Sequence, residues 1–213
     1  MPYTVVPSVE QLPPYDDMDI TAGRSYRYYG TTNQTRAVAP LWLFGDGLSY
    51  TSWNYSAMNL SIAAVGQCAN VTVGVTVTNT GKVAGSEVAQ LYVTIPNTQL
   101  AGTPTASPGS ESQHPNKAMR TVRPLWQLAG VVRTATLAPG ASARLVFTIN
   151  ARALSVVYAD GRRYVEHGEA ILWAGGSSPA GLMKEGMQKA TVKITGPYPL
   201  ELSKCPAAAR NIV

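Results

Sequence analysis

The chain has 213 residues, a net charge of +5 and only 14% charged side chains, and glycine and proline together make up about 16% of it. An average soluble domain is roughly 25% charged and about 12% glycine plus proline, so this composition favours β structure with many turns. It argues against a coiled coil or a helical bundle, and the 45% of hydrophobic residues argues against a disordered chain. We expect one large domain or two small ones.

Residues 1–50 have no sustained helical or strand periodicity. Five prolines interrupt them, and Pro13-Pro14 forces an extended backbone. Residues 1–6 look like a strand taken from a larger unit, and residues 1–17 lack the basic and apolar regions of a signal peptide. Linkers are normally polar, whereas this segment is aromatic, so we expect it to lie along a partner surface. Its aromatic residues are Tyr3, Tyr15, Tyr26, Tyr28, Tyr29, Trp42, Phe44 and Tyr50.

From Trp53 onward the pattern changes to period two. Val71, Val73, Val75 and Val77 alternate with small or polar residues, which is the pattern of a half-buried strand. Short strands separated by turn signals are typical of a β-sandwich of immunoglobulin-like size. The other expected strands cover residues 55–62, 88–95, 125–132, 143–149, 163–165, 169–174 and 190–194.

The charge is unevenly distributed along the chain. Residues 1–106 carry a net charge of −2 and residues 107–213 a net charge of +7. The basic residues are scattered along expected strands and are not clustered with aromatic residues, so we expect a solvated basic face and no nucleic-acid partner. No apolar run approaches the roughly 20 residues that span a bilayer, and we expect no membrane helix.

Asparagine sequons suggest a secretory history. Four of the nine asparagines are followed by the glycosylation pattern, more than chance gives, so Asn33, Asn54, Asn59 and Asn70 are candidate N-glycosylation sites. In that compartment Cys68 and Cys205 are a candidate disulfide, which would join the ends of the sandwich. The alternative is two unrelated buried thiols.

The carboxylates do not form a recognisable catalytic or metal-binding pattern. Asp16, Asp17 and Asp19 are clustered, but a hard cation needs about six oxygens and a glycine-containing loop, so we expect a solvated or salt-bridged loop and no metal site. Glu166 and Glu169 flank His167 in an expected turn, with no visible burial or partner that would suit an acid or base.

Nucleophilic and phosphate-binding patterns are also missing. His114 and His167 belong to no Ser-His-Asp order with an elbow motif. Gly175-Gly176 is not followed by a lysine and a hydroxyl residue, which a phosphate loop requires. We therefore expect no catalytic residue, no substrate-binding residue, no metal site and no cofactor in this chain.

Several motifs resemble glycoside hydrolase family 3. Gly23-Arg-Ser-Tyr-Arg-Tyr28 is similar to that family's Gly-Arg-Thr-Tyr-Arg-Phe, and Leu43-Phe-Gly-Asp-Gly-Leu-Ser-Tyr-Thr51 to its Pro-Phe-Gly-x-Gly-Leu-Ser-Tyr-Thr. Leu43 replaces a usual proline, and Asp46 stands where an aromatic residue or histidine is common. Further similarities follow in the family's order at residues 1–5, 77–81, 85–92, 125–130, 137–140, 154–155, 166–169 and 175–178.

The resemblance implies an all-β fold preceded by part of another domain. Residues 1–50 would be the end of an α/β sandwich domain and an interdomain connection, an extended remnant of that domain. Residues 51–197 would form an immunoglobulin-like, fibronectin type III-like β-sandwich, and residues 198–213 a C-terminal tail. The long polar loop at 96–119 would either reach towards the active site of the parent enzyme or be a mobile surface loop.

The resemblance also implies a parent enzyme that removes terminal β-D-xylose or β-D-glucose with retention, as in plant-type polysaccharide breakdown. Retention needs two carboxyl groups about 5 Å apart, and the family holds them in regions that precede the motifs matched here. This chain alone should be inactive, a structural module of a secreted enzyme whose missing N-terminal catalytic domains are its partners. It would meet carbohydrate only through that parent. The alternative is a stand-alone carbohydrate-binding or adhesion sandwich with exposed coplanar aromatic rings, for which Trp42, Trp126 and Trp173 are candidates.

Overall fold

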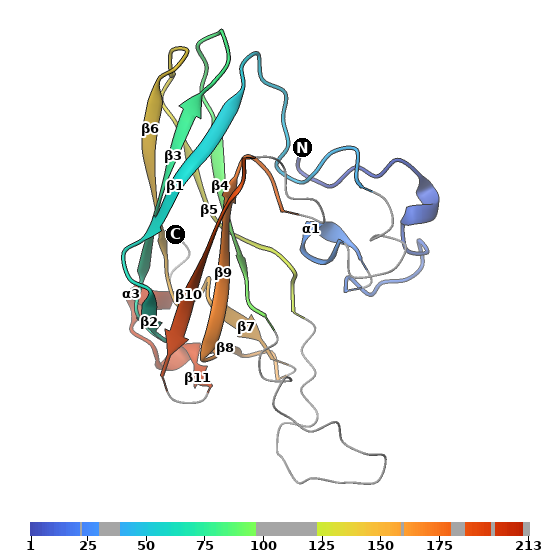
Figure 1. Cartoon of the computed structure of the whole chain (residues 1–213). Helices are drawn as coiled ribbons and strands as arrows, with labels where there is room; N and C mark the ends of the chain where they lie inside the picture. Colours follow the sequence, from blue (N-terminus) through green and yellow to red (C-terminus); the bar gives the residue numbers. More distant parts are fainter. Residues whose placement is uncertain are drawn as a thin grey trace.

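The computed structural model of the chain describes residues 1–21, 23–29, 39–96, 123–158, 160–179, 186–196 and 199–210. Its main body is a β-sandwich, and an N-terminal segment, blue in Figure 1, lies beside its long flank. The described residues of that segment include two short helices, η1 (Val9–Gln11) and α1 (Ser25–Tyr28). The strands are β1 (Trp53–Leu60), β2 (Ala64–Gly66), β3 (Val71–Asn79), β4 (Val88–Thr94), β5 (Gln127–Arg133), β6 (Ser142–Ile149), β7 (Ser155–Val157), β8 (Arg163–Val165), β9 (Gly168–Gly175), β10 (Gln188–Thr195) and β11 (Leu200–Glu201). Two further helices, η3 (Leu202–Lys204) and α3 (Ala207–Arg210), follow β11.

The strands form two main sheets that face each other. One has the order β1-β3-β6 and the other the order β2-β10-β9-β4-β5, while β11, β8 and β7 form a small third sheet at one end. All pairs in the two main sheets are antiparallel except β2 with β10. Figure 1 shows the main sheets side by side along their length. This arrangement confirms the expected all-β, fibronectin type III-like sandwich.

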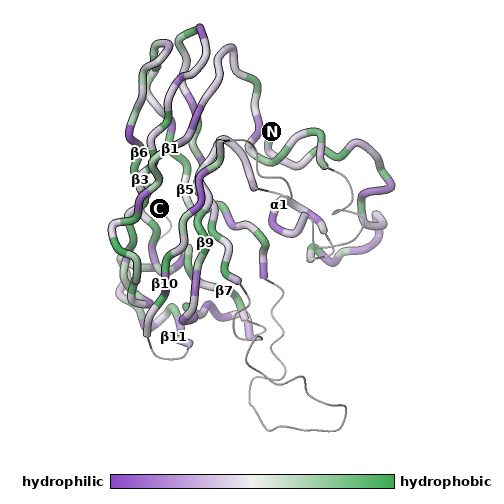
Figure 2. Tube along the Cα trace, in the orientation of Figure 1, coloured by the Kyte–Doolittle hydropathy of each residue, from purple (hydrophilic) through white to green (hydrophobic). Residues whose placement is uncertain are grey.

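The core lies between the sheets, where strands such as β3 and β6 turn alternate apolar residues inward, whereas β4 is buried at five consecutive positions. Along β3, Val71, Val73, Val75 and Val77 are fully buried, whereas Thr72 is exposed. The facing sheet contributes buried residues from β4, β9 and β10, among them Leu91, Leu172 and Val192. Figure 2 shows hydrophobic and hydrophilic positions interleaved along these strands. The period-two pattern is therefore explained by inward and outward alternation on a pleated sheet.

Three short strands depart from the expected list. β2, β7 and β11 have two or three residues each, too few for a periodic pattern. The segment expected to be a tail after residue 197 also packs against the sandwich. Leu202, Cys205 and Ala209 belong to the main core cluster, and β11 pairs with β8. The apolar side chains of Leu202, Cys205 and Ala209 therefore pack into the core at the open end of the sandwich.

Candidate functional site

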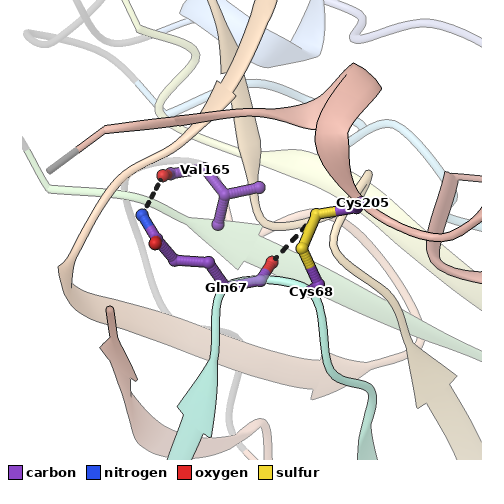
Figure 3. The surroundings of a disulfide bond; sticks show 4 residues. All are labelled: Gln67, Cys68, Val165 and Cys205. Atoms are coloured by element: carbon purple, nitrogen blue, oxygen red, sulfur yellow. Dashed lines mark hydrogen bonds between the residues drawn. A yellow bond between two sulfur atoms is a disulfide. The ribbon is translucent and has the colours of Figure 1, made fainter. Parts of the chain in front are cut away.

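A disulfide joins Cys68 and Cys205 across this open end of the sandwich. Cys68 follows β2, and Cys205 caps η3, so the bond ties the C-terminal helices to the edge of the five-stranded sheet. The two Cα atoms are 5.3 Å apart, within the usual range for this bond. Beside it, the buried Gln67 side chain donates from Nε2 to the Val165 carbonyl at 2.6 Å (Figure 3). The bond therefore holds a packed part of the core.

The N-terminal segment attaches to the sandwich through aromatic rings. Tyr26 of α1 stacks on Phe44 with ring centroids 4.1 Å apart, and its edge faces Tyr92 of β4 at 6.0 Å. The Tyr26 hydroxyl accepts a hydrogen bond from the Leu128 amide at 3.2 Å. The Arg27 carbonyl accepts another from the amide of Leu125 at 2.7 Å. The ring and hydroxyl of Tyr26 explain the tyrosine of the first resembling motif, whereas Arg27 contributes only its backbone carbonyl.

The second motif forms a tight turn against the same face. Gly45 has a φ of +87°, and an added Cβ would lie 2.2 Å from the side chain of Gln90, so only glycine fits there. The buried Asp46 carboxylate accepts the Leu43 amide at 2.8 Å, and the Phe44 carbonyl accepts the amide of Ser178. Asp46, the departure from the family pattern, is thus used to close the turn.

Beyond these contacts the N-terminal segment leaves large apolar side chains in solvent. Its own cluster consists of buried Tyr29 and Leu43, with Val6 and Trp126 packed against them. Tyr15 and Tyr50 are 94% and 97% exposed. We call the exposed set the apolar surface: Tyr3, Val9, Leu12, Tyr15, Met18, Ile20, Leu41, Leu48 and Tyr50. A surface with this many exposed apolar groups is typical of a binding face.

A buried ion pair was missed by the sequence reasoning. Glu166 was expected in an open turn, but its side chain is only 4% exposed and lies 2.6 Å from Nη2 of Arg123. The Tyr158 hydroxyl also donates to this carboxylate. Because Arg123 and Glu166 are 43 positions apart, no local motif relates them. The burial is explained by the pairing, since an isolated buried carboxylate would be costly.

Two buried tyrosines have pKa values far above the ordinary one. Burial raises the pKa of Tyr55, and the carboxylate of Glu87, to which its hydroxyl donates at 2.8 Å, raises it further. Burial also raises the pKa of Tyr92, with smaller contributions from Tyr26 and Asp46. Both phenols therefore stay neutral and act as fixed hydrogen-bond donors within the sandwich.

The acidic cluster near the N-terminus is used for local turns. The Asp17 carboxylate accepts the Asp19 amide at 2.9 Å, and the Asp19 carboxylate accepts both the amide and the hydroxyl of Thr21. These hydrogen bonds lower the pKa of Asp19, mainly through the Thr21 hydroxyl. Within the described part of the chain no group of three potential metal-ligating side chains comes together.

The remaining predicted residues fall on the surface or outside the described part. Asn54 and Asn59 are exposed on β1, Asn70 is exposed just before β3, and Asn33 lies outside the described residues. Trp126 and Trp173 meet edge to face, with their planes 85° apart. Trp173 is buried, so these two rings do not form a flat binding platform. Of the loop expected at 96–119, only Pro96 is described.

His167 is exposed just before β9, and Glu169 is exposed on that strand. No helix in the described ranges is long and apolar enough to cross a membrane.

Comparison with known proteins identifies relatives for most of the chain. A fibronectin type III-like domain family matches residues 112–178. The thermostable beta-glucosidase B of Acetivibrio thermocellus is 31% identical over 171 residues, which make up 79% of this chain and 19% of that protein. A beta-xylosidase of Formosa agariphila is 34% identical over 145 residues, 68% of this chain and 17% of that protein. The chain thus spans about a fifth of the length of these curated relatives.

Solved structures agree with these sequence matches. The beta-D-glucoside glucohydrolase of Trichoderma reesei superposes with a TM-score of 0.63 and 27% identity, over 91% of this chain and 26% of that one. Beta-glucosidase 3B of Thermotoga neapolitana, solved with glucose, gives a TM-score of 0.60 and 28% identity over 86% of this chain and 21% of that one. This chain therefore belongs with glycoside hydrolase family 3, as a C-terminal region that includes the family's fibronectin type III-like domain.

Proposed function

We propose that this chain is the non-catalytic C-terminal part of a retaining, exo-acting β-glycosidase that removes terminal β-D-glucose or β-D-xylose. Residues 51–197 act as a stabilising module, and residues 1–50 complete an α/β sandwich domain whose remainder belongs to the parent enzyme. The observation that carries this proposal is the apolar surface of the N-terminal segment, which includes the exposed Tyr15 and Tyr50. The sandwich, in contrast, buries its own apolar residues in one core. A neighbouring domain of the parent would cover that surface.

The relatives support the same assignment. Their names are those of beta-glucosidases and a beta-xylosidase, and the matched region makes up only about a fifth of each. Glycoside hydrolysis with retention needs two carboxyl groups about 5 Å apart across the glycosidic bond. Glu166, a buried carboxylate, is paired with Arg123 and is not free to act as an acid or base. Catalysis would therefore reside in the part of the parent that precedes this chain.

Activity assays and a chimera test the proposal. The purified chain should not release nitrophenol from nitrophenyl β-glucoside or β-xyloside. In the Acetivibrio thermocellus beta-glucosidase B, deleting the matched region should abolish activity, and inserting this chain should restore it. A chimera that carries Tyr26→Ala serves as a matched control, because it removes the ring through which the N-terminal segment contacts the sandwich. Turnover by the chain alone would contradict the proposal, as would retardation by xylan in affinity electrophoresis, which favours a stand-alone binding module.

We also propose that the parent is secreted and glycosylated. Asn54, on β1, and Asn70, just before β3, carry exposed side chains, so an attached glycan would extend into solvent. The disulfide between Cys68 and Cys205 is compatible with an oxidising compartment. Expression through a eukaryotic secretory pathway should give a mass that falls on treatment with an N-glycosidase. An unchanged mass, with no glycan on any of the four sequons, would contradict glycosylation.

A further inference from the structure

A pocket of about 110 Å³ lies between the N-terminal segment and the sandwich. Arg27 and Tyr28 of α1 line it on one side, and Arg123, Gln127 and Arg163 line it on the other. The Arg27 carbonyl accepts the Leu125 amide, so the two walls are held together by the backbone. The pocket is therefore a built feature of the junction, assembled from parts of the chain about 100 to 140 positions apart.

Positive charge in this pocket exceeds the negative charge available to balance it. Three arginines line it, and the like charge of a fourth, Arg152, acts on Arg163. Burial lowers the pKa of Arg163, and the charges of Arg152 and Arg27 lower it further. Among the described residues, only Glu166 pairs with any of these four arginines, and it pairs with Arg123. The other three arginines have no acidic partner in that part of the chain.

Arg123 is the most buried of the charged side chains whose exposure is known at the wall of the pocket. Its side chain is 10% exposed, and its Nε atom is buried with no hydrogen-bond partner among the described residues. A buried donor without a partner costs about 1–3 kcal/mol, so such atoms are rare in native structures unless something binds there. Glu166 already occupies one face of this guanidinium, at Nη2. Glu166 therefore neutralises Arg123, and the unbalanced charge of the pocket comes from the other arginines.

We propose that this pocket is a binding site for a carboxylate group. A guanidinium presents a planar pair of N–H donors that matches the two oxygens of a carboxylate, and burial strengthens such charge-assisted hydrogen bonds. The volume admits a carboxyl group and a few further atoms but not an oligosaccharide. Gln127 and the ring of Tyr28 can contact hydroxyl or carbon atoms next to that group. The carboxylate would come from a free hydroxy acid of the sugar-acid type or from an acidic side chain of another domain.

Nuclear magnetic resonance of the labelled 213-residue chain tests this directly. The arginine Nε–Hε signals are followed while glucuronate is added at constant ionic strength, with neutral glucose as the matched compound without the carboxylate. Blocked aspartate, N-acetyl-aspartate amide, represents the protein source. We expect saturable shifts with glucuronate or blocked aspartate, with Kd on the order of 1 mM, and none with glucose. The tighter of the two acids identifies the source.

Charge variants make the test specific to the pocket. Arg163→Gln and Arg27→Gln should each weaken carboxylate binding about tenfold or more, because each removes a charged hydrogen-bond donor. Arg162→Gln is the control: it removes the same charge from an exposed neighbour that pairs with Glu201, and it should leave the affinity unchanged. Thermal unfolding of each variant checks the fold, and Arg27, which is exposed, provides the variant least able to disturb it.

Several outcomes would overturn the proposal. Equal loss of affinity in all three variants would show a general effect of net charge. Equal shifts with glucose and glucuronate would show that the carboxylate is not recognised. Tighter binding of inorganic phosphate than of either acid would mean that the site selects a different anion. Linear shifts without saturation up to 100-fold excess over the chain would exclude a site altogether.

Discussion

The sandwich and the N-terminal segment differ in how they bury their apolar residues. In the sandwich, residues such as Val73 and Leu91 are fully buried between two sheets of the same chain. In the segment, Tyr29 and Leu43 are buried, but Met18 and Leu48 are 85% and 89% exposed. Both regions have apolar side chains, so composition does not separate them. What separates them is a second layer, which covers the residues of the sandwich and which the described structure does not provide for the exposed residues of the segment.

The largest expected effect comes from the disulfide, which stabilises only the sandwich. Its cysteines are 137 positions apart, and closing a loop of that length contributes about 5 kcal/mol in the chain-entropy model. Replacing both residues by alanine should therefore lower the free energy of unfolding by about 2–5 kcal/mol. Urea unfolding of the two proteins measures this. A change below about 1 kcal/mol would mean that the unfolded chain is already compact.

Substitution of a buried leucine in the sandwich should lower the free energy of unfolding far more than substitution of an exposed leucine in the segment. Leu91→Ala removes a fully buried side chain and should cost about 2–5 kcal/mol, through lost burial and the cavity left behind. Leu48→Ala removes the same atoms from an 89% exposed position and should change stability by less than about 0.5 kcal/mol. Equal losses in thermal or urea unfolding would show that the apolar surface is covered within the chain itself.

Alkaline pH should destabilise the sandwich through its two buried phenols. Burial raises the folded-state pKa of Tyr55 and Tyr92 well above the ordinary value of about 10, so only the unfolded chain loses these protons as the pH rises. The stabilising effect is complete below about pH 10 and decreases above it, by up to about 1.4 kcal/mol per tyrosine for each pH unit. Urea midpoints from pH 8 to 11.5 measure this. Tyr55→Phe should have a shallower slope than the parent chain, and identical slopes would contradict the assignment for Tyr55.

The smallest effect on global stability should come from separating the two regions. Tyr26→Ala removes the ring that stacks on Phe44 and faces Tyr92, with a loss of about 1 kcal/mol at most from global unfolding, because the sandwich core is untouched. Hydrogen exchange should nevertheless become faster at the amides of Leu125 and Leu128, whose acceptors lie in α1. Unchanged exchange there would mean that Tyr26 does not hold the segment in place.

The sequence predicts the sandwich well because its strands are long enough to repeat. β3 shows four buried valines in alternation, and the strands around it follow the same rule. It does not predict β7 or β11, whose two or three residues carry no periodicity and are held by neighbouring strands. The ion pair of Arg123 with Glu166 and the pocket beside it were likewise invisible. They depend on segments far apart in the chain, which only the fold brings together.

The disulfide also has a consequence for a chain that has been cut. Because Cys68 and Cys205 enclose 137 positions, a single break of the backbone anywhere between them leaves two pieces that remain covalently attached. After limited proteolysis, such a protein would migrate as one species without reductant and as two with it. A cleaved chain could therefore retain both sheets and both walls of the arginine pocket. Where proteases are present, this one covalent bond would keep the two pieces of a cleaved domain together.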